Sequence, residues 1–193
     1  LSIGRRSTGQ RREKLRELVH KDLLDYSAIE SDLTGYDACF FCLGVSAVGM
    51  TEDEYRRLTH DLTLAVAGTL AKLNPGLVFC YVSGQGTDSS EQGRFMWARV
   101  KGKTENDLLR LRFTAYMLRP GYIQPMDGIR SKTRVYRLFY AAMAPLYPVL
   151  RRLAPNLMTT SQLVGRAMIR LAARGYHRRV LEVRDINALA SGT

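Results

Sequence analysis

The sequence predicts an α/β fold with a doubly wound parallel sheet. Short, nearly continuous apolar runs alternate along the chain with longer segments whose apolar residues recur at helical spacing. Strands that are apolar throughout are buried on both faces, as parallel strands are. With 193 residues, 46% of them hydrophobic and 24% charged, the chain has the length and composition of one globular domain. We therefore expect a single domain over residues 1–193.

Six apolar runs are the predicted strands. Most of them end in small or turn-forming residues, for example at Gly44, at Ser83–Gly84 and at Pro120–Gly121. Because the carboxyl ends of parallel strands share one edge of a sheet, we expect ligands to bind at these residues. The six runs are Leu1–Ile3, Leu18–Val19, Ala38–Leu43, Leu77–Val82, Ala115–Leu118 and Val180–Val183.

Three segments between these runs are predicted helices. The first begins at Thr51, where Glu54 follows three residues later and completes a capping box, and it ends near Asn74–Pro75–Gly76. The second runs from about Gln92 to Leu111, and the third from Thr159 or Thr160 to Gly175.

The segment 122–158 does not fit the alternation. Pro145 and Pro148 interrupt what would otherwise be an amphipathic helix with basic ends. We predict that residues 122–158 form an insertion or lid on the substrate side. Contact of the stretch Tyr136–Leu153 with an anionic membrane surface is a weaker alternative, which uses the basic flanks up to Arg152.

The net charge of +11 does not by itself indicate a nucleic-acid partner. The basic residues are dispersed along the chain, and no recognition motif or aromatic platform accompanies them. The uncharged apolar run Leu138–Leu150 is shorter than the roughly 20 residues that a spanning helix needs. Arginines at positions 5, 6, 11 and 12 interrupt the first residues, unlike the apolar core of a signal peptide.

The three cysteines, Cys39, Cys42 and Cys80, all fall inside apolar runs and are too few for a disulfide framework. This usage predicts a reducing compartment, and we expect the cytoplasm. Cys39 and Cys42 have the spacing of a metal or redox motif. On a strand, however, residues three apart face opposite sides, so we expect no metal site there.

Several landmarks follow one another in an order that is similar to a known family. The chain resembles the NAD(P)-binding epimerase/dehydratase-like branch of the short-chain dehydrogenase/reductase superfamily, over about its first 130 residues. That resemblance implies a Rossmann-type fold and a dinucleotide cofactor. The landmarks are Gly4–Arg5–Arg6, Lys21–Asp22–Leu23, Leu43–Gly44, Ser83, Lys101 and Arg119–Pro120–Gly121.

The resemblance implies NADP as the cofactor, ahead of NAD. Arg5 and Arg6 stand where the family holds the adenosine 2′-phosphate, and an acidic residue there would favour NAD instead. A solvated arginine pair is the alternative. The other implied cofactor contacts are Asp22 and Leu23 at the adenine, Leu43, Gly44 and Ser46 at the nicotinamide ribose, and Gly121 and Ile123 at the carboxamide.

The implied catalytic set is a Ser, a Tyr and a Lys, with the Tyr four residues before the Lys on one helix face. Ser83 and Lys101 match it, and Lys101 would also bind the nicotinamide ribose, but Trp97 stands where the Tyr belongs. An indole is no general acid near neutral pH. Two functions therefore stay open: an epimerase/dehydratase-like or oxidoreductase-like enzyme with a small-molecule substrate, and a non-catalytic cofactor-sensing or scaffold protein.

The resemblance also predicts a gap in the sheet. In the strand order 3-2-1-4-5-6, Leu1–Ile3 corresponds to the second strand and Ala38–Leu43 to the fourth, so the central first strand and its glycine-rich loop lie outside this sequence. Gly84-x-Gly86 does not supply that loop, because the rest of the fingerprint is missing. We expect about 25–35 further residues, the length of one strand–helix unit.

Overall fold

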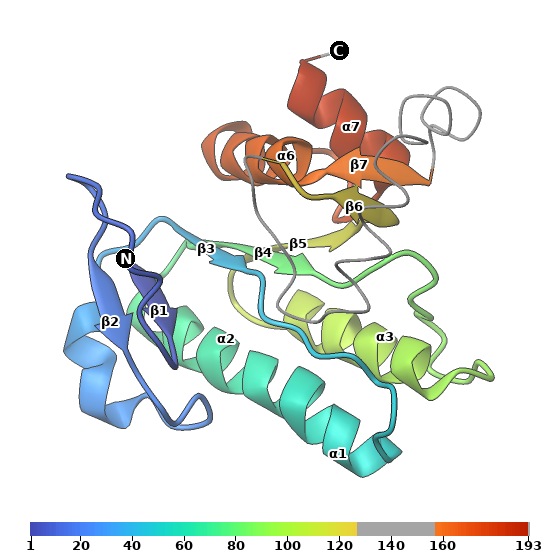
Figure 1. Ribbon diagram of the computed structural model, residues 1–193, viewed down its shortest axis with the longest axis horizontal. Helices are drawn as coiled ribbons and strands as arrows, with labels where there is room; N and C mark the ends of the chain where they lie inside the picture. The colour runs from blue at the N-terminus through green and yellow to red at the C-terminus, as the bar shows by residue number, and fades with distance from the viewer. Residues whose placement is uncertain (127–156, 193) are drawn as a thin grey trace.

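The computed structural model describes residues 1–126 and 157–192 and has a four-stranded parallel sheet at its centre (Figure 1). Its strand order is β3-β4-β5-β8, and every neighbouring pair is parallel. The prediction of a doubly wound α/β fold is therefore confirmed. The four strands are β3 (Ala38–Phe41), β4 (Val78–Val82), β5 (Thr114–Arg119) and β8 (Val180–Glu182).

Helices cover both faces of this sheet (Figure 1). Phe79 and Met117 point to one face, where they join a core with residues of α2 and α3. Cys80 and Leu118, the next residues along the same strands, point to the other face and pack with α6 and α7. The first layer consists of α1 (Glu52–Arg56), η2 (Arg57–Asp61), α2 (Leu62–Leu73) and α3 (Met96–Leu109), and the second of α6 (Ser161–Arg174) and α7 (Val183–Ser191).

The helix starts follow their local sequence. Thr51 Oγ1 accepts the Glu54 N–H at 3.3 Å while Glu54 Oε2 accepts the Thr51 N–H at 2.9 Å, so the predicted capping box is confirmed. Thr160 Oγ1 accepts the Leu163 N–H at 3.1 Å and caps α6. The helix expected from about Gln92 begins only at Met96, after a turn region.

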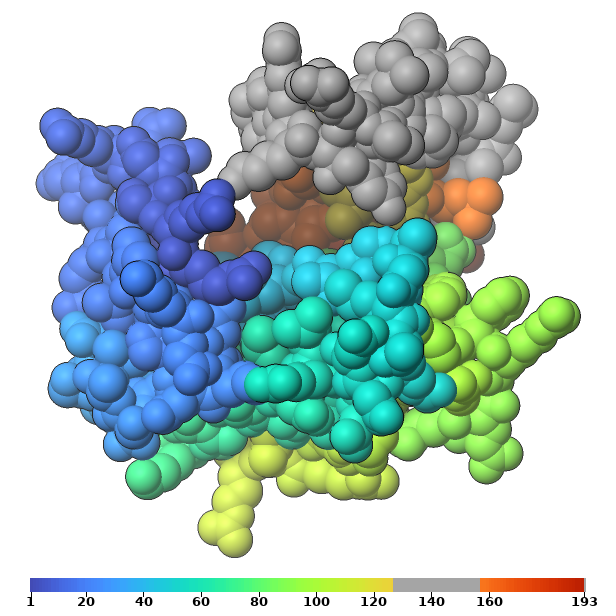
Figure 2. Space-filling model, turned by 60° about the horizontal axis from the view of Figure 1, so that its bottom comes forward, coloured from blue at the N-terminus to red at the C-terminus, as the bar shows by residue number. Residues whose placement is uncertain are grey.

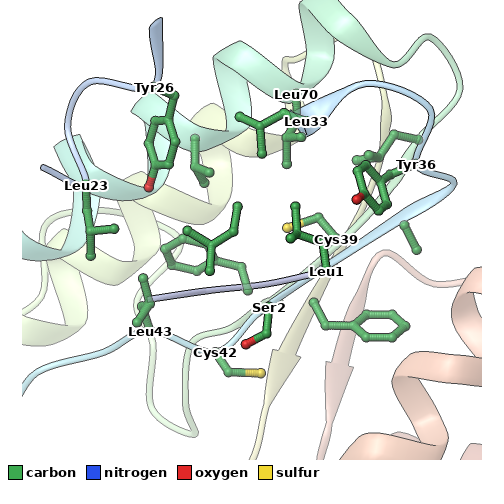
Figure 3. A pocket seen from close by; sticks show the side chains of 16 residues that line it. Leu1, Ser2, Leu23, Tyr26, Leu33, Tyr36, Cys39, Cys42, Leu43 and Leu70 are labelled. Atoms are coloured by element: carbon green, nitrogen blue, oxygen red, sulfur yellow. The ribbon is translucent and has the colours of Figure 1, made fainter. Parts of the chain in front are cut away.

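The N-terminal strands form a separate sheet. β1 (Ser2–Gly4) and β2 (Glu17–Val19) pair in parallel, and Figure 1 shows β1 on the side of β2 that faces β3. Within the described residues, β1 pairs only with β2 and β3 only with β4. A cavity of about 540 Å³ lies between β1 and β3 and is lined by both (Figure 3). Within residues 1–126 and 157–192, β1 and β3 therefore do not pair directly with each other.

Some short elements were not predicted from the sequence. They are η1 (Ser27–Leu33), the parallel pair β6 (Tyr122–Gln124) and β7 (Met158–Thr160), and α7. β6 and β7 are the two ends of the predicted insertion 122–158. The interior of that insertion, with the stretch Tyr136–Leu153 and its membrane alternative, lies outside the described residues. Across residues 1–126 and 157–192, the helices are too short or too polar to cross a membrane.

Candidate functional site

The loops that follow β4 and β5 are joined at the carboxyl edge of the sheet. The Ser83 N–H donates to the Leu118 C=O at 2.9 Å, and the Gln85 N–H donates to the Pro120 C=O at 2.8 Å. These bonds continue the strand pairing for a few residues past the end of β4. The edge predicted from the sequence therefore holds Ser83 against the end of β5.

The hydroxyl of Ser83 is already engaged by a buried carboxylate. Ser83 is 4% exposed, and its Oγ donates to Glu105 Oε1 at 2.5 Å and lies 3.1 Å from the Leu118 C=O. Glu105, on α3, is fully buried. A hydroxyl held in this way is not free to orient a substrate carbonyl unless the contact with Glu105 is exchanged.

Arg119 neutralises the carboxylate of Glu105. Its Nε lies 3.1 and 3.2 Å from the two Glu105 oxygens, and its Nη2 forms an ion pair with the same carboxylate. Its Nη1 also reaches Glu182 at 3.3 Å, and its Nη2 donates to Ser89 Oγ at 2.6 Å. Burial tends to lower the pKa of Arg119, but the hydrogen bonds and charge of Glu105 outweigh this and raise it. The Arg119 guanidinium therefore keeps its charge beside the buried carboxylate.

Lys101 lies one helical turn before Glu105 on α3. Its Nζ donates to the backbone C=O of Ser83, and a Cβ at Gly84 would lie 3.6 Å from that nitrogen. Burial lowers the pKa of Lys101, while the nearby Glu105 carboxylate opposes that shift. The structure thus brings Ser83 and Lys101 together, as predicted, although Lys101 contacts the backbone of Ser83.

Trp97 lies beside the loop after β4. A Cβ at Gly86 would lie 3.2 Å from Trp97 Cη2, so the indole packs on this turn. Three buried tyrosines do not supply the general acid that Trp97 lacks. Burial raises the pKa of Tyr81 well above its usual range, and it also raises the pKa values of Tyr26 and Tyr55.

Arg5 and Arg6 follow β1 and are both exposed. Neither guanidinium forms an ion pair or hydrogen bond with the described residues. Asp22 is exposed and its Oδ1 accepts the Leu24 N–H at 2.9 Å, whereas Leu23 is buried and lines the cavity between β1 and β3. Two exposed cations and an apolar wall therefore lie at the ends of β1 and β2.

The loop after β3 is open. Leu43, Gly44 and Ser46 are all exposed, and Leu43 also lines the cavity. Ser46 Oγ accepts the Val48 N–H at 3.3 Å, a contact within the turn. In Figure 3, Leu43 and Leu23 lie on the same side of the cavity. The structure brings these two predicted adenine and ribose contacts to one cavity wall.

Gly121 is packed where no side chain fits. A Cβ there would lie 2.3 Å from the Leu157 C=O oxygen and 2.6 Å from Gln85 Oε1. Ile123 lies in β6, half-buried, and pairs with Thr159 of β7. Gly121 thus joins the group of Ser83 and Lys101, while Ile123 belongs to the small sheet beyond it.

Sequence reasoning missed Glu105 as a site residue and used Arg119 only as a landmark. One signal was available: Glu105 stands four residues after Lys101, so both lie on one face of the predicted helix. The partner at the end of β5 could not be found in this way, because 14 positions separate it from Glu105.

Comparisons with known proteins give a distant relative. The chain matches no family model. Over 137 residues it is 29% identical to Protein FMP52-2, mitochondrial, of Scheffersomyces stipitis, a match that covers 69% of this chain and 57% of the relative. The chain thus spans less than two thirds of that relative's length.

Fold and site together define a doubly wound α/β protein with a polar carboxyl edge, but not the family expected from the sequence. The assignment to the epimerase/dehydratase-like branch of the short-chain dehydrogenases is wrong, since no family model matches and the relative is not described as an epimerase or dehydratase. Strand ends with Gly, Ser or Arg occur in many doubly wound sheets, so landmarks of this kind did not identify a branch.

The expected cytoplasmic location is also wrong, because the relative is a mitochondrial protein by name. The three cysteines are free in the structure. Free cysteines do not distinguish the cytoplasm from another compartment, so they could not carry that expectation.

Proposed function

We propose that this protein binds a dinucleotide, NADP(H) ahead of NAD(H), along the carboxyl edge of its sheet. The observation that carries the proposal is the exposed pair Arg5 and Arg6 directly after β1, without partners among the described residues. The strand order reverses between β1 and β3, and doubly wound sheets bind nucleotides at such a point. Unpaired guanidinium groups there suit a phosphate, because their donors match its oxygens.

The remaining contacts would be shared between two groups of residues. Leu23 and Leu43 provide apolar surface for a base, and Asp22, Gly44 and Ser46 provide polar or open backbone positions beside it. At the other end, Lys101 and Gly121 lie at the ends of β4 and β5, with Ile123 just beyond, where the nicotinamide end would reach. When bound, the cofactor would supply a hydride donor or acceptor.

The chemistry at that end favours binding over carbonyl reduction. Glu105 occupies the Ser83 hydroxyl, and Trp97 replaces the phenol that would donate a proton. We therefore put a cofactor-sensing or scaffold role first and an oxidoreductase second. The second candidate is favoured by Lys101, whose half-buried ammonium donates to the backbone C=O of Ser83. By analogy with the relative, a mitochondrial setting belongs to this proposal.

Titration by intrinsic and cofactor fluorescence tests the binding proposal. NADPH is expected to bind roughly 10- to 100-fold more tightly than NADH, because charge-assisted contacts to the 2′-phosphate contribute about 1.5–3 kcal/mol. The double substitution Arg5→Ala plus Arg6→Ala should remove this preference and leave NADH affinity unchanged. Arg11→Ala plus Arg12→Ala, two other exposed arginines of the same segment, is the matched control. Equal affinities for both cofactors, or an equal effect of the control, would count against the proposal.

Trp97→Tyr tests whether the cofactor-sensing or scaffold role ranks above the oxidoreductase role. We expect negligible NADPH-dependent reduction of carbonyl compounds by the unaltered protein, and a measurable rise in Trp97→Tyr, since a positioned general acid contributes about 10²- to 10⁴-fold. The assay follows NADPH absorbance with a panel of small aldehydes and ketones. Robust turnover by the unaltered protein that disappears in Ser83→Ala would put the oxidoreductase first.

A further inference from the structure

One sequence pattern occurs at two places in the chain, and the two places differ in structure. Two adjacent arginines precede a threonine, with one residue between, in Arg5–Arg6–Ser7–Thr8 and again in Arg56–Arg57–Leu58–Thr59. Arginine-directed protein kinases select a substrate hydroxyl in this pattern, because acidic residues of the kinase bind the two guanidinium groups. The pattern alone does not distinguish the two threonines.

Thr59 is inaccessible to a kinase. It lies in the π-helical turn η2 and is 5% exposed, and its backbone C=O accepts the Thr63 hydroxyl at 2.5 Å. A kinase binds its substrate as an extended segment, so η2 would have to unwind and leave its packing against α3 before the hydroxyl could be reached. The fold therefore protects Thr59.

Thr8 lies in an open segment between β1 and β2. Residues 5–14 are all exposed, and residues 5–12 belong to no helix or strand. In Figure 2, blue N-terminal residues project at one corner of the molecule. A segment of this kind can become extended in the cleft of a kinase without any loss of core packing. The structure therefore selects Thr8 over Thr59.

The Thr8 hydroxyl contacts a carboxylate at the surface. The Oγ1 and the N–H of Thr8 both donate to Glu17 Oε1, the N–H at 2.9 Å, and the Ser7 hydroxyl donates to Glu17 Oε2 at 2.6 Å. The hydrogen bonds from Ser7 and Thr8 lower the pKa of Glu17, so its carboxylate is ionised near neutral pH. Glu17 thus holds the start of the segment against β2.

A phosphate on Thr8 would reverse this contact. It replaces a hydroxyl donor with a group of nearly two negative charges beside the Glu17 carboxylate, so that attraction becomes repulsion. Arg5 and Arg6, two and three residues earlier, are exposed and carry the donors that suit a phosphate. The modified segment would therefore leave Glu17 and turn toward the two guanidinium groups.

We propose that Thr8 is a phosphorylation site of an arginine-directed protein kinase and that its phosphate then binds Arg5 and Arg6. In the reaction the Thr8 oxygen forms a bond to the γ-phosphorus of ATP, the bond to the ADP oxygen breaks, and the hydroxyl proton passes to the catalytic carboxylate of the kinase. The new phosphate competes with the 2′-phosphate of NADP(H) for the same arginines. This regulation rests on the proposed function, whereas the modification itself does not.

The modification is tested on the full chain with the catalytic subunit of cAMP-dependent protein kinase and Mg·ATP. Mass spectrometry of fragments should place the phosphate on Thr8. Thr8→Val should take up none, and Ser7→Ala should be modified like the unaltered protein. A synthetic peptide of residues 52–63 should be phosphorylated on Thr59, which would show that the fold, and not the sequence, protects that residue. No uptake at Thr8, or uptake at Thr59 of the folded protein at the same rate, would overturn the proposal.

Cofactor titrations measure the competition. Phosphorylation should weaken NADPH binding roughly 10- to 100-fold, the factor expected for the 2′-phosphate contacts, and should change NADH affinity by less than about threefold. Phosphatase treatment should restore NADPH binding. Thr8→Val, carried through the same kinase treatment, is the matched control and should keep its NADPH affinity.

NMR of the arginine side chains gives a measurement without cofactor. The Nε–H signals of Arg5 and Arg6 should shift on phosphorylation, and those of Arg11 and Arg12 should not. Shifts confined to Arg11 and Arg12 would overturn the assignment of the phosphate to the first pair.

The failure of this inference and that of the proposed function are distinguishable. If the unmodified protein binds NADPH and NADH equally, the cofactor proposal fails, while uptake at Thr8 and the shifts of Arg5 and Arg6 still decide the modification and its binding site. If the unmodified protein prefers NADPH and keeps that preference after phosphorylation, the cofactor proposal stands and the competition is wrong.

Discussion

The buried pair of Glu105 and Arg119 decides the character of the candidate site at the scale of single residues. Glu105 is fully buried and accepts hydrogen bonds from both Ser83 and Arg119. A buried ion pair is costly to form, since both charges leave water, and breaking it by removing one partner is costlier still. This carboxylate therefore fixes the Ser83 hydroxyl and the end of β5 together.

Glu105→Leu is expected to lower the free energy of unfolding by about 3–5 kcal/mol, because it removes the buried carboxylate of the pair and leaves the Arg119 guanidinium with only the more exposed Glu182. Glu105→Leu combined with Arg119→Leu should cost less than the sum of the single changes. Urea denaturation measures all three variants. As a control, Glu52→Leu breaks the more exposed pair with Arg99, whose closest contact is 2.5 Å, and should cost about 1 kcal/mol or less. Additive losses at Glu105 and Arg119 would show that the two do not act as a pair.

Gly121 lets the loop after β5 pass close to the backbone of Leu157, an approach that any amino acid with a Cβ would prevent. Gly121→Ala would place a Cβ 2.3 Å from the Leu157 backbone oxygen, so the loop after β5 must shift. We expect a loss of roughly 1–3 kcal/mol, measured as a lower thermal midpoint. Gly44→Ala is the matched control, because a Cβ there meets nothing within 4 Å. If the two variants melt alike, the packing around Gly121 is looser than described.

At the scale of elements, the long helical segment α1–η2–α2 is tied to α3 through one histidine. His60, in the π-helical turn η2, lies 2.8 Å by its Nε2 from Asp107 Oδ2 and 2.7 Å by its Nδ1 from Asp61 Oδ1. Lys103 and Arg110 of the same region also contact Asp107, at 3.1 and 2.8 Å. Burial tends to raise the pKa of Asp107, but its hydrogen bonds to His60 and Lys103 and their positive charges lower it.

Asp107→Asn should therefore destabilise the protein in a pH-dependent way. A carboxyl whose pKa is lower in the folded state contributes stability above its unfolded pKa, and this contribution is lost as the pH falls through the folded pKa. We expect a deficit of about 1 kcal/mol near neutral pH, because the side chain is 20% exposed and partly screened. Denaturation curves of both proteins from pH 7 downward should converge in the acid range. A deficit that is constant with pH would contradict this account.

At the scale of the whole molecule, the sheet is covered unevenly. Phe79 of β4 is fully buried and stacks on Phe113, with ring centroids 5.2 Å apart. Phe40, on the adjacent strand β3, is 44% exposed on the opposite face. The space-filling view shows the blue N-terminal residues gathered at one end, beside the teal residues near α2 (Figure 2). Layers on both faces thus protect the middle of the sheet better than its β3 side.

This difference predicts unequal costs for two like substitutions. Phe79→Ala should lower the free energy of unfolding by about 3–5 kcal/mol, because it leaves a cavity in the core. Phe40→Ala should cost much less, about 1 kcal/mol, since Phe40 is 44% exposed and its removal leaves no enclosed cavity. Chemical denaturation compares the two. Equal losses would indicate that a further segment covers Phe40 in solution.

Local sequence patterns predicted most of the helices and strands. They failed where an element is very short or where its first residues form turns. The strands β3, β4 and β5 and the helix that Thr51 caps are long enough for a hydrophobic pattern to identify them. β6 and β7 have three residues each, too few for a period of two to be recognised. The start of α3 was placed early, because residues from Gln92 to Phe95 form turns that a helical pattern cannot exclude.

The sequence by itself determined the parallel α/β architecture and the polar residues at the strand ends, because hydrophobic period and chain order are properties of neighbouring residues. Only the tertiary structure decided what those polar residues do. The contact of Ser83 with Glu105 spans 22 positions, and that of Glu105 with Arg119 joins a helix to a strand end. Such contacts depend on how α3 packs on the sheet, and no local pattern encodes that packing.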